Sequence, residues 1–329
     1  MSTTPWAWTI TLVVAVGFLV VDVFVIGRRP HEPSMRESAS HLAFFVGAAL
    51  LFATGVFLVS GADYGAQFLG GWLTEYSLSI DNLFIFLIIM SKLQVPRELQ
   101  QAALLIGIVM ALILRGIFIA LGAAAINTFS WVFYLFGAFL VYTAVKLARH
   151  DEDEEQDYSD RRLIRWLREH IPSTEEYHGS HLSVRIAGRR LATPMLIVIA
   201  ALGTTDLLFA LDSIPAIYGI TEEPYLVLTA NLFALMGLRQ LYFLIGGLLE
   251  RLVYLSIGLA VLLGFIGVKL ILHALHENSI PFVNGGKHVS WAPDVPIWLS
   301  LVMIVAILTI TTVASLAKTG RRRRADEIS

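Results

Sequence analysis

Long apolar stretches separated by short polar segments dominate the chain. Crossing a bilayer takes about 20 mostly apolar residues in a helix, and nine stretches approach or exceed that length: 6–27, 41–60, 67–91, 101–125, 129–149, 194–218, 225–249, 251–275 and 295–317. The residue-by-residue alternation of a transmembrane β-barrel is absent from them. The pattern therefore predicts an all-α, polytopic membrane protein with about nine transmembrane helices, because helices satisfy their own backbone hydrogen bonds in lipid.

Basic residues gather in alternate connecting segments. If the N-terminus lies outside, the cytoplasmic segments are 28–40, 92–100, 150–193, 250–251 and the tail after 317, and they hold nearly all the basic residues of the connections. The opposite segments hold one, Lys287. The positive-inside rule then predicts an external N-terminus and a cytoplasmic C-terminus. The expected location is a bacterial-type inner (plasma) membrane.

Composition narrows the chemistry. The chain is 56% hydrophobic and 15% charged, and it has no cysteine, which excludes disulfides, thiolate metal sites and a cysteine nucleophile. No nucleophile–base set or phosphate-binding loop is present, so we expect neither an enzyme with catalytic residues nor a tightly bound cofactor. The basic tail, Arg321 to Arg324, is interpreted as a topology anchor against anionic lipid rather than a nucleic-acid site. Protein partners and oligomeric state stay open.

Two segments resemble each other in the order of their landmarks. Each has two acids six residues apart, then a helix with an arginine, then a helix ending in Val-Lys-Leu. Three helices per unit place the second copy upside down, a hallmark of secondary transporters that bind substrate near midplane. The predicted organisation is 1–66, two N-terminal transmembrane helices; 67–149, the first repeat; 150–193, a cytoplasmic loop with an interfacial amphipathic helix; 194–275, the inverted second repeat; and 276–329, an external loop, the last helix and the basic tail.

The acids of the repeat are the main candidates for chemistry. An ionised side chain at the bilayer centre costs about 2.5–3.5 kcal/mol on insertion scales, so the acids need a cation, an arginine or a proton beside them. Acids six apart on a regular helix project about 120° from each other, and Pro215 removes a backbone hydrogen bond beside Asp212. The expected metal ligands are Glu75, Asp81, Asn82, Asp206, Asp212 and Ser213.

A second group of polar residues is expected to balance charge or gate access: Arg115, Arg239, Asn231, Lys146 and Lys269. The plain alternative is that the acids only pair with Arg115 and Arg239 and hold helices together. Two arginines cannot neutralise four carboxylates, however, and the surplus equals the charge of one divalent ion. Carboxylate, amide, hydroxyl and carbonyl oxygens suit hard ions such as Mn²⁺, Mg²⁺ or Ca²⁺, and the residues alone do not separate manganese from the others.

The same residues resemble the two motifs of the TerC/Alx family of integral membrane proteins. The resemblance rests on Glu75-Tyr-Ser-Leu-Ser-Ile-Asp81-Asn82 and Phe209-Ala-Leu-Asp212-Ser213-Ile-Pro215-Ala, and it extends from about Asp22 to Lys269. It implies a fold related to the lysine-exporter superfamily, manganese export in the Alx branch, and metal handling by the matched acids. Some members carry glutamate where Gly203 stands here, which puts one ligand, and with it ion preference, in doubt.

The resulting hypothesis is a secondary transporter that exports a divalent metal ion, Mn²⁺ first and Ca²⁺ or Mg²⁺ next, with proton entry as the expected coupling reaction. The alternative is a membrane scaffold for insertion or metallation of exported proteins, or a tellurite-resistance-associated membrane protein, without ion flux. Either way the partners would be a divalent ion and the lipid bilayer, with no nucleic acid.

Overall fold

The computed structural model describes residues 5–14, 17, 34–129, 131–149, 174, 176–186, 189–245, 254–276, 289, 291–293 and 295–326. Within these ranges eight helices are long and apolar enough to cross a membrane, and a shorter apolar helix spans Pro5–Val14. The all-helical polytopic membrane fold is therefore confirmed. The rest of the predicted first span and the amphipathic helix in the cytoplasmic loop lie outside the described residues, so the count of nine stays a prediction.

The helices follow the apolar stretches closely. They are α2 (Met35–Ser60), α3 (Ala62–Lys92), α4 (Arg97–Thr128), α5 (Val132–Arg149), α8 (Pro194–Tyr218), α9 (Pro224–Met236), α10 (Leu238–Ile245), α11 (Leu255–His276) and α12 (Ile297–Asp326). Local signals set several of the ends. The Ser34 hydroxyl accepts a hydrogen bond from the Glu37 amide at the start of α2, and Pro194 and Pro224 open α8 and α9 at a position where no amide hydrogen is needed.

Two features differ from the expected elements. The stretch predicted as one helix over 225–249 is divided into α9 and α10 at Gly237, whose weak helix propensity favours an interruption. A small antiparallel hairpin, β1 (Ser183–Ile186) and β2 (Arg189–Ala192), lies in the segment read only as a cytoplasmic loop. Pro215, which cannot donate the backbone hydrogen bond expected at its position, lies within an uninterrupted α8.

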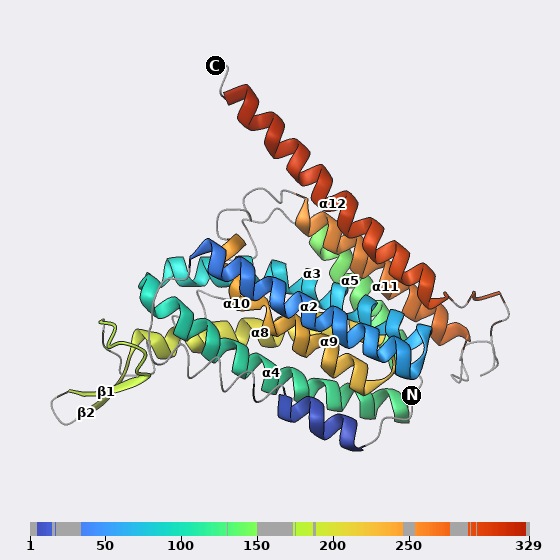
Figure 1. Ribbon diagram of the computed structural model, residues 1–329, viewed down its shortest axis with the longest axis horizontal. Helices are drawn as coiled ribbons and strands as arrows, with labels where there is room; N and C mark the ends of the chain where they lie inside the picture. The colour runs from blue at the N-terminus through green and yellow to red at the C-terminus, as the bar shows by residue number, and fades with distance from the viewer. Residues whose placement is uncertain are drawn as a thin grey trace.

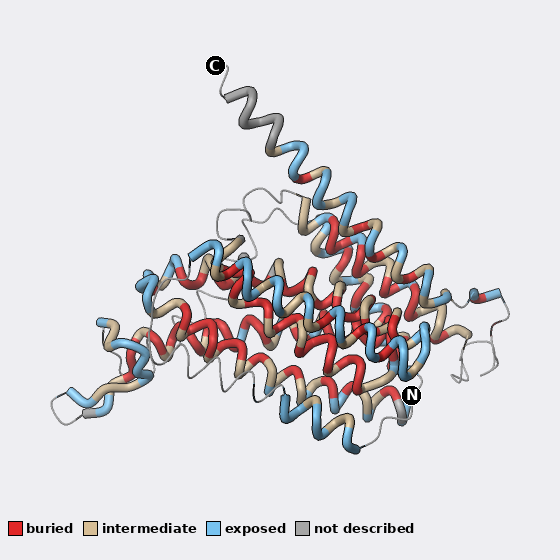
Figure 2. Tube along the Cα trace, in the orientation of Figure 1, coloured by how far each residue is buried: buried red, intermediate tan, exposed pale blue. Residues whose placement is uncertain are grey.

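The bundle core is formed by the two predicted repeat units; in Figure 1, α2 crosses the front of the bundle and α12 runs along one side of it. Figure 2 shows buried residues concentrated in α3, α8, α9 and α11, whereas exposed residues line the outer sides of α2 and α12. Those outer sides are apolar, with Leu51, Leu58 and Val59 on α2 and Ile310 and Val313 on α12 among the exposed side chains. Exposed apolar helix faces of this kind suit contact with lipid.

The third helices of the two predicted units, α5 and α11, run antiparallel. In the α5–α11 pair, the Phe133 ring packs edge-on against His273, and Gly264 lies against Ala144 near the other end. The first helix of each unit also contacts the second helix of the other unit: α3 packs on α9, and α8 packs on α4. These contacts agree with an inverted arrangement, although equivalence of the two units is still a prediction.

Predicted segments of each membrane side meet as expected. Tyr64, Glu222 and Pro296 line one pocket, and they lie in or beside the predicted external segments 61–66, 219–224 and 276–294. The Tyr177 hydroxyl, from the predicted cytoplasmic loop, donates a hydrogen bond to the Leu93 carbonyl at 2.8 Å. These contacts agree with the predicted grouping of the segments involved, whereas the sidedness of the other segments and the absolute orientation stay predictions.

Glycines bring the α5 and α11 backbones into direct contact. A Cβ added at Gly137 would lie 2.8 Å from the Gly267 carbonyl oxygen, and one at Gly267 would lie 2.9 Å from the Gly137 carbonyl oxygen. Small residues permit this close approach of membrane helices, which gain van der Waals contact from it.

We expect Gly137→Ala to destabilise the protein by about 1–3 kcal/mol, because the added methyl group meets backbone atoms that cannot rotate away. Thermal unfolding in detergent measures the loss. Gly116→Ala on α4 is the matched control, since nothing lies within 4 Å of its added Cβ. A Gly137→Ala protein as stable as the Gly116→Ala protein would contradict the tight contact.

Candidate functional site

A buried arginine joins the two predicted repeat units at the centre of the bundle. The Arg115 guanidinium on α4 forms an ion pair with Glu75 on α3 through Nη1 and Oε1. Its Nη2 donates to Asp206 Oδ1 on α8 at 3.1 Å, and its Nε lies 3.4 Å from Asp206 Oδ2. The three side chains are 0–2% exposed, and each lies near the middle of its helix. We call Glu75, Arg115 and Asp206 the central triad.

The central triad carries a charge imbalance. Two carboxylates face one guanidinium, so with each group in its usual ionised state the triad has a net charge of −1. The second carboxylate oxygen of Glu75, Oε2, makes no hydrogen bond within the described part of the chain. A buried ionised group with unsatisfied bonding capacity is costly in a dry interior, so the site would gain from an additional cation or proton.

Close helix packing brings α4 and α8 together around the triad. A Cβ added at Gly107 would lie 3.6 Å from Leu202. Gly203 faces the terminal methyl group of Met110, and that methyl occupies the space a side chain at 203 would need. Met110 thus fills the volume beside Gly203 with an apolar group.

Neutral polar groups are buried on the same helices. Ser79 lies one turn after Glu75 on α3, and Ser213 lies two turns after Asp206 on α8, so each shares a helix face with its acid. On α9, Asn231 follows Ala230, which packs against Gly71, one turn before Glu75 on α3. The Ser79 and Ser213 hydroxyls and both polar atoms of Asn231 have no hydrogen-bond partner among the described residues, and these side chains are at most 1% exposed.

The second acid of each predicted pair behaves differently from the first. Asp212 is half-buried, and its Oδ1 accepts a hydrogen bond at 3.0 Å from the Thr143 hydroxyl of α5, not from the central triad. This fits the 120° separation expected for acids six apart on a regular helix. Asp81 lies on α3, but its side chain is outside the described part of the structure.

The remaining predicted residues occupy varied positions. Asn82 is buried on α3, and Arg239 is half-buried at the start of α10. The two lysines that mark equivalent points of the repeat differ, because Lys146 is exposed whereas Lys269 is buried. Within the described ranges no group of three or more His, Asp or Glu side chains is placed to hold one metal ion. The roles predicted for these residues therefore stay predictions. Of the predicted acids, Glu75 and Asp206 are the pair that the described structure brings together, through Arg115.

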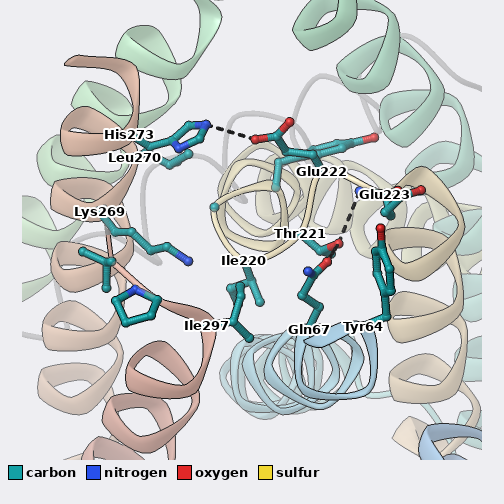
Figure 3. A pocket seen from close by; sticks show the side chains of 14 residues that line it. Tyr64, Gln67, Ile220, Thr221, Glu222, Glu223, Lys269, Leu270, His273 and Ile297 are labelled. Atoms are coloured by element: carbon teal, nitrogen blue, oxygen red, sulfur yellow. Dashed lines mark hydrogen bonds and ion pairs between the residues drawn. The ribbon is translucent and has the colours of Figure 1, made fainter. Parts of the chain in front are cut away.

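A polar pocket of about 300 Å³ opens at the end of the bundle where α8 ends and α9 begins (Figure 3). His273 on α11 reaches toward Glu222, with 3.0 Å between His273 Nε2 and Glu222 Oε1. The Thr221 hydroxyl donates to Gln67 Oε1 at 2.6 Å and also accepts from the Glu223 amide. Lys269 points into the same pocket (Figure 3).

Sequence reasoning missed several of these polar contacts. Gln67, Thr143 and the Glu222–His273 pair lie outside the repeated acidic motif. The adjacent acids Glu222 and Glu223 in a turn of six residues between apolar stretches were the available signal. Nothing local to the sequence could show that Thr143, on a different helix, reaches Asp212.

Comparison with known proteins identifies the group to which the chain belongs. The model of the TerC family, described as an integral membrane protein family, matches residues 60–323. An uncharacterized membrane protein of Mycobacterium tuberculosis is 46% identical over 318 residues, covering 96% of this chain and 80% of its own. One from Myxococcus xanthus is 38% identical, covering 98% of this chain and 95% of its own.

A third relative has a more specific name. The Escherichia coli K12 protein called "putative membrane-bound redox modulator Alx" is 39% identical, covering 94% of this chain and 93% of its own. No solved structure matches the chain. The match over most of the length, together with the apolar helices and the resemblance of the two acidic motifs, shows that the chain belongs to the TerC family of integral membrane proteins.

Proposed function

We propose that the protein is a secondary transporter that exports a divalent metal ion, with Mn²⁺ as the first candidate substrate. The observation that carries the proposal is the central triad, in which two buried carboxylates from the first helices of both predicted repeat units share one guanidinium. In inverted-repeat transporters the substrate binds near midplane where the repeats meet. Glu75, Arg115 and Asp206 each lie near the middle of a long apolar helix, which supports a site at that level.

The surrounding ligands favour a hard cation. Carboxylate oxygens of Glu75 and Asp206 could be joined by the neutral oxygens of Ser79, Ser213 and Asn231, which are buried without hydrogen-bond partners in the described structure. Oxygen ligands of this kind suit Mn²⁺, Mg²⁺ and Ca²⁺. Asp212 and the polar pocket at the end of α8 would then lie along the route between the central triad and the predicted external face.

The name of one relative suggests a redox role, but in this chain such a role could not use thiol chemistry. The chain contains no cysteine, so it cannot itself form or exchange a disulfide. Metal transport uses the acidic residues that the chain does have, and we therefore favour it.

Purified protein reconstituted into liposomes should take up Mn²⁺ in a saturable manner, measured by quenching of a metal-sensitive dye in the lumen. Parallel series with Ca²⁺, Mg²⁺ and Zn²⁺ define the selectivity, and protein-free liposomes give the leak. Saturable flux of another of these ions without Mn²⁺ flux would replace the ion assignment. Absence of saturable flux for all four ions, with protein that elutes as a single folded species, would refute the transport proposal.

A further inference from the structure

We propose that Arg115 is a tethered counter-ion that takes the place of the transported cation when the carrier is empty. This inference rests on the proposed function and concerns how the same site completes a transport cycle. It assigns Arg115 as a positioning residue that competes with the substrate for Glu75 and Asp206, and not as a fixed structural ion pair.

Geometry supports competition for the same atoms. The guanidinium reaches Glu75 through Nη1 and reaches Asp206 through Nη2 and Nε, so its fork occupies carboxylate oxygens on two different helices. A divalent ion coordinated by the same two carboxylates would need those oxygens. Arginine, which stays ionised and forms several bonds from one planar group, suits this bridging role.

The polar surroundings support a second arrangement of the site. If Arg115 only held helices together, the buried polar groups on the helices beside it should have their hydrogen bonds satisfied, as buried polar groups generally do. Instead Glu75 Oε2, the Ser79 and Ser213 hydroxyls and the Asn231 amide have no partner within the described residues. These groups are buried, and they offer oxygen atoms that the arginine does not use.

The need for a counter-ion follows from net transport. A carrier that releases its metal ion outside must return without it, and any carboxylates that return unpaired and ionised in a dry bundle would oppose that step. Arg115 neutralises one of the two charges, donates hydrogen bonds to Asp206 and forms an ion pair with Glu75. A carrier without Arg115 would return mainly with a cation bound, and it would therefore exchange cations more readily than it exports them.

The test compares two fluxes in the same liposomes for wild type, Arg115→Gln and Arg97→Gln. Exchange is followed with Mn²⁺ on both sides of the membrane and a radioactive tracer on one side, whereas net efflux is followed with Mn²⁺ on one side only. We expect the ratio of net efflux to exchange to fall about tenfold or more in Arg115→Gln, because only the empty return loses its counter-ion. Arg97, exposed at the start of the same helix, provides the matched control and should keep the wild-type ratio.

A second variant keeps the inference testable if Arg115→Gln does not fold. Arg115→Lys keeps the positive charge but lacks the planar fork that reaches both carboxylates, so the competitor is weakened and Mn²⁺ affinity should rise several-fold in calorimetric titration. An unchanged flux ratio in folded Arg115→Gln, or an unchanged or lower affinity in Arg115→Lys, would overturn the inference. Absence of both fluxes from wild type would instead overturn the proposed function on which it rests.

Discussion

Replacing Asp206 with asparagine is expected to weaken Mn²⁺ binding by about ten- to hundredfold, because losing an interaction with a charged group costs roughly 1.5–3 kcal/mol. Asparagine keeps the shape of the side chain but removes its negative charge. Titration calorimetry of the purified protein measures the affinity, and liposome flux should fall in parallel at Mn²⁺ concentrations below saturation.

The same substitution should leave the fold intact. Asp206→Asn converts the central triad into a one-to-one pair of Glu75 and Arg115, which removes the surplus negative charge rather than exposing a new one. Thermal unfolding in cation-free buffer should therefore show no loss of stability. Asp63→Asn, at an exposed position in the first turn of α3, is the control for charge removal. Equal Mn²⁺ affinity in the Asp206→Asn and Asp63→Asn proteins would exclude Asp206 as a ligand.

Replacing Arg115 with methionine should have the largest effect on stability. The change leaves the Glu75 and Asp206 carboxylates buried without their shared partner, and breaking a buried ion pair in this way costs about 3–5 kcal/mol. Thermal unfolding in the presence of a chelator measures the loss. Added Mn²⁺ should recover part of it, by about 2.7 kcal/mol at a concentration 100 times the dissociation constant.

A triple variant separates charge from packing in this result. Glu75→Gln, Arg115→Met and Asp206→Asn together remove all three charges, so the protein should be more stable than the Arg115→Met variant and should not respond to Mn²⁺. Equal stability of the triple and single variants would show that the loss comes from the packing of Arg115 and not from uncompensated carboxylates.

Most of the fold could be predicted from the sequence because lipid leaves few options. A spanning segment must be apolar, long and helical, so α2 through α5 and α8 could be located from hydropathy alone. The hairpin could not, since its four-residue strands carry a weak signal inside a polar segment. The division of α9 from α10 depends on how Gly237 packs beside Tyr76 of α3 and Leu42 of α2, which no local pattern reveals.

The candidate site was only partly predictable. Repetition and the cost of buried charge pointed to Glu75, Asp206 and Arg115, but their connection is a three-helix contact that depends on the register of α3, α4 and α8. Pairing of an acid with an arginine was the plain alternative to a metal site, and the structure shows such pairing for Glu75 and Asp206. Thr143 beside Asp212 and Met110 beside Gly203 are likewise tertiary contacts that become visible only when the helices are placed.

The glycine contact between α5 and α11 limits how a transport cycle could proceed. Where two backbones touch, no side chain lies between them that could change rotamer to make room. Sliding α5 past α11 would therefore bring carbonyl oxygens into steric clash. That pair is therefore suited to act as the stationary axis of the molecule. Changes that open the site alternately to the two sides would fall on the helices that carry the acids, α3 and α8, turning about this axis.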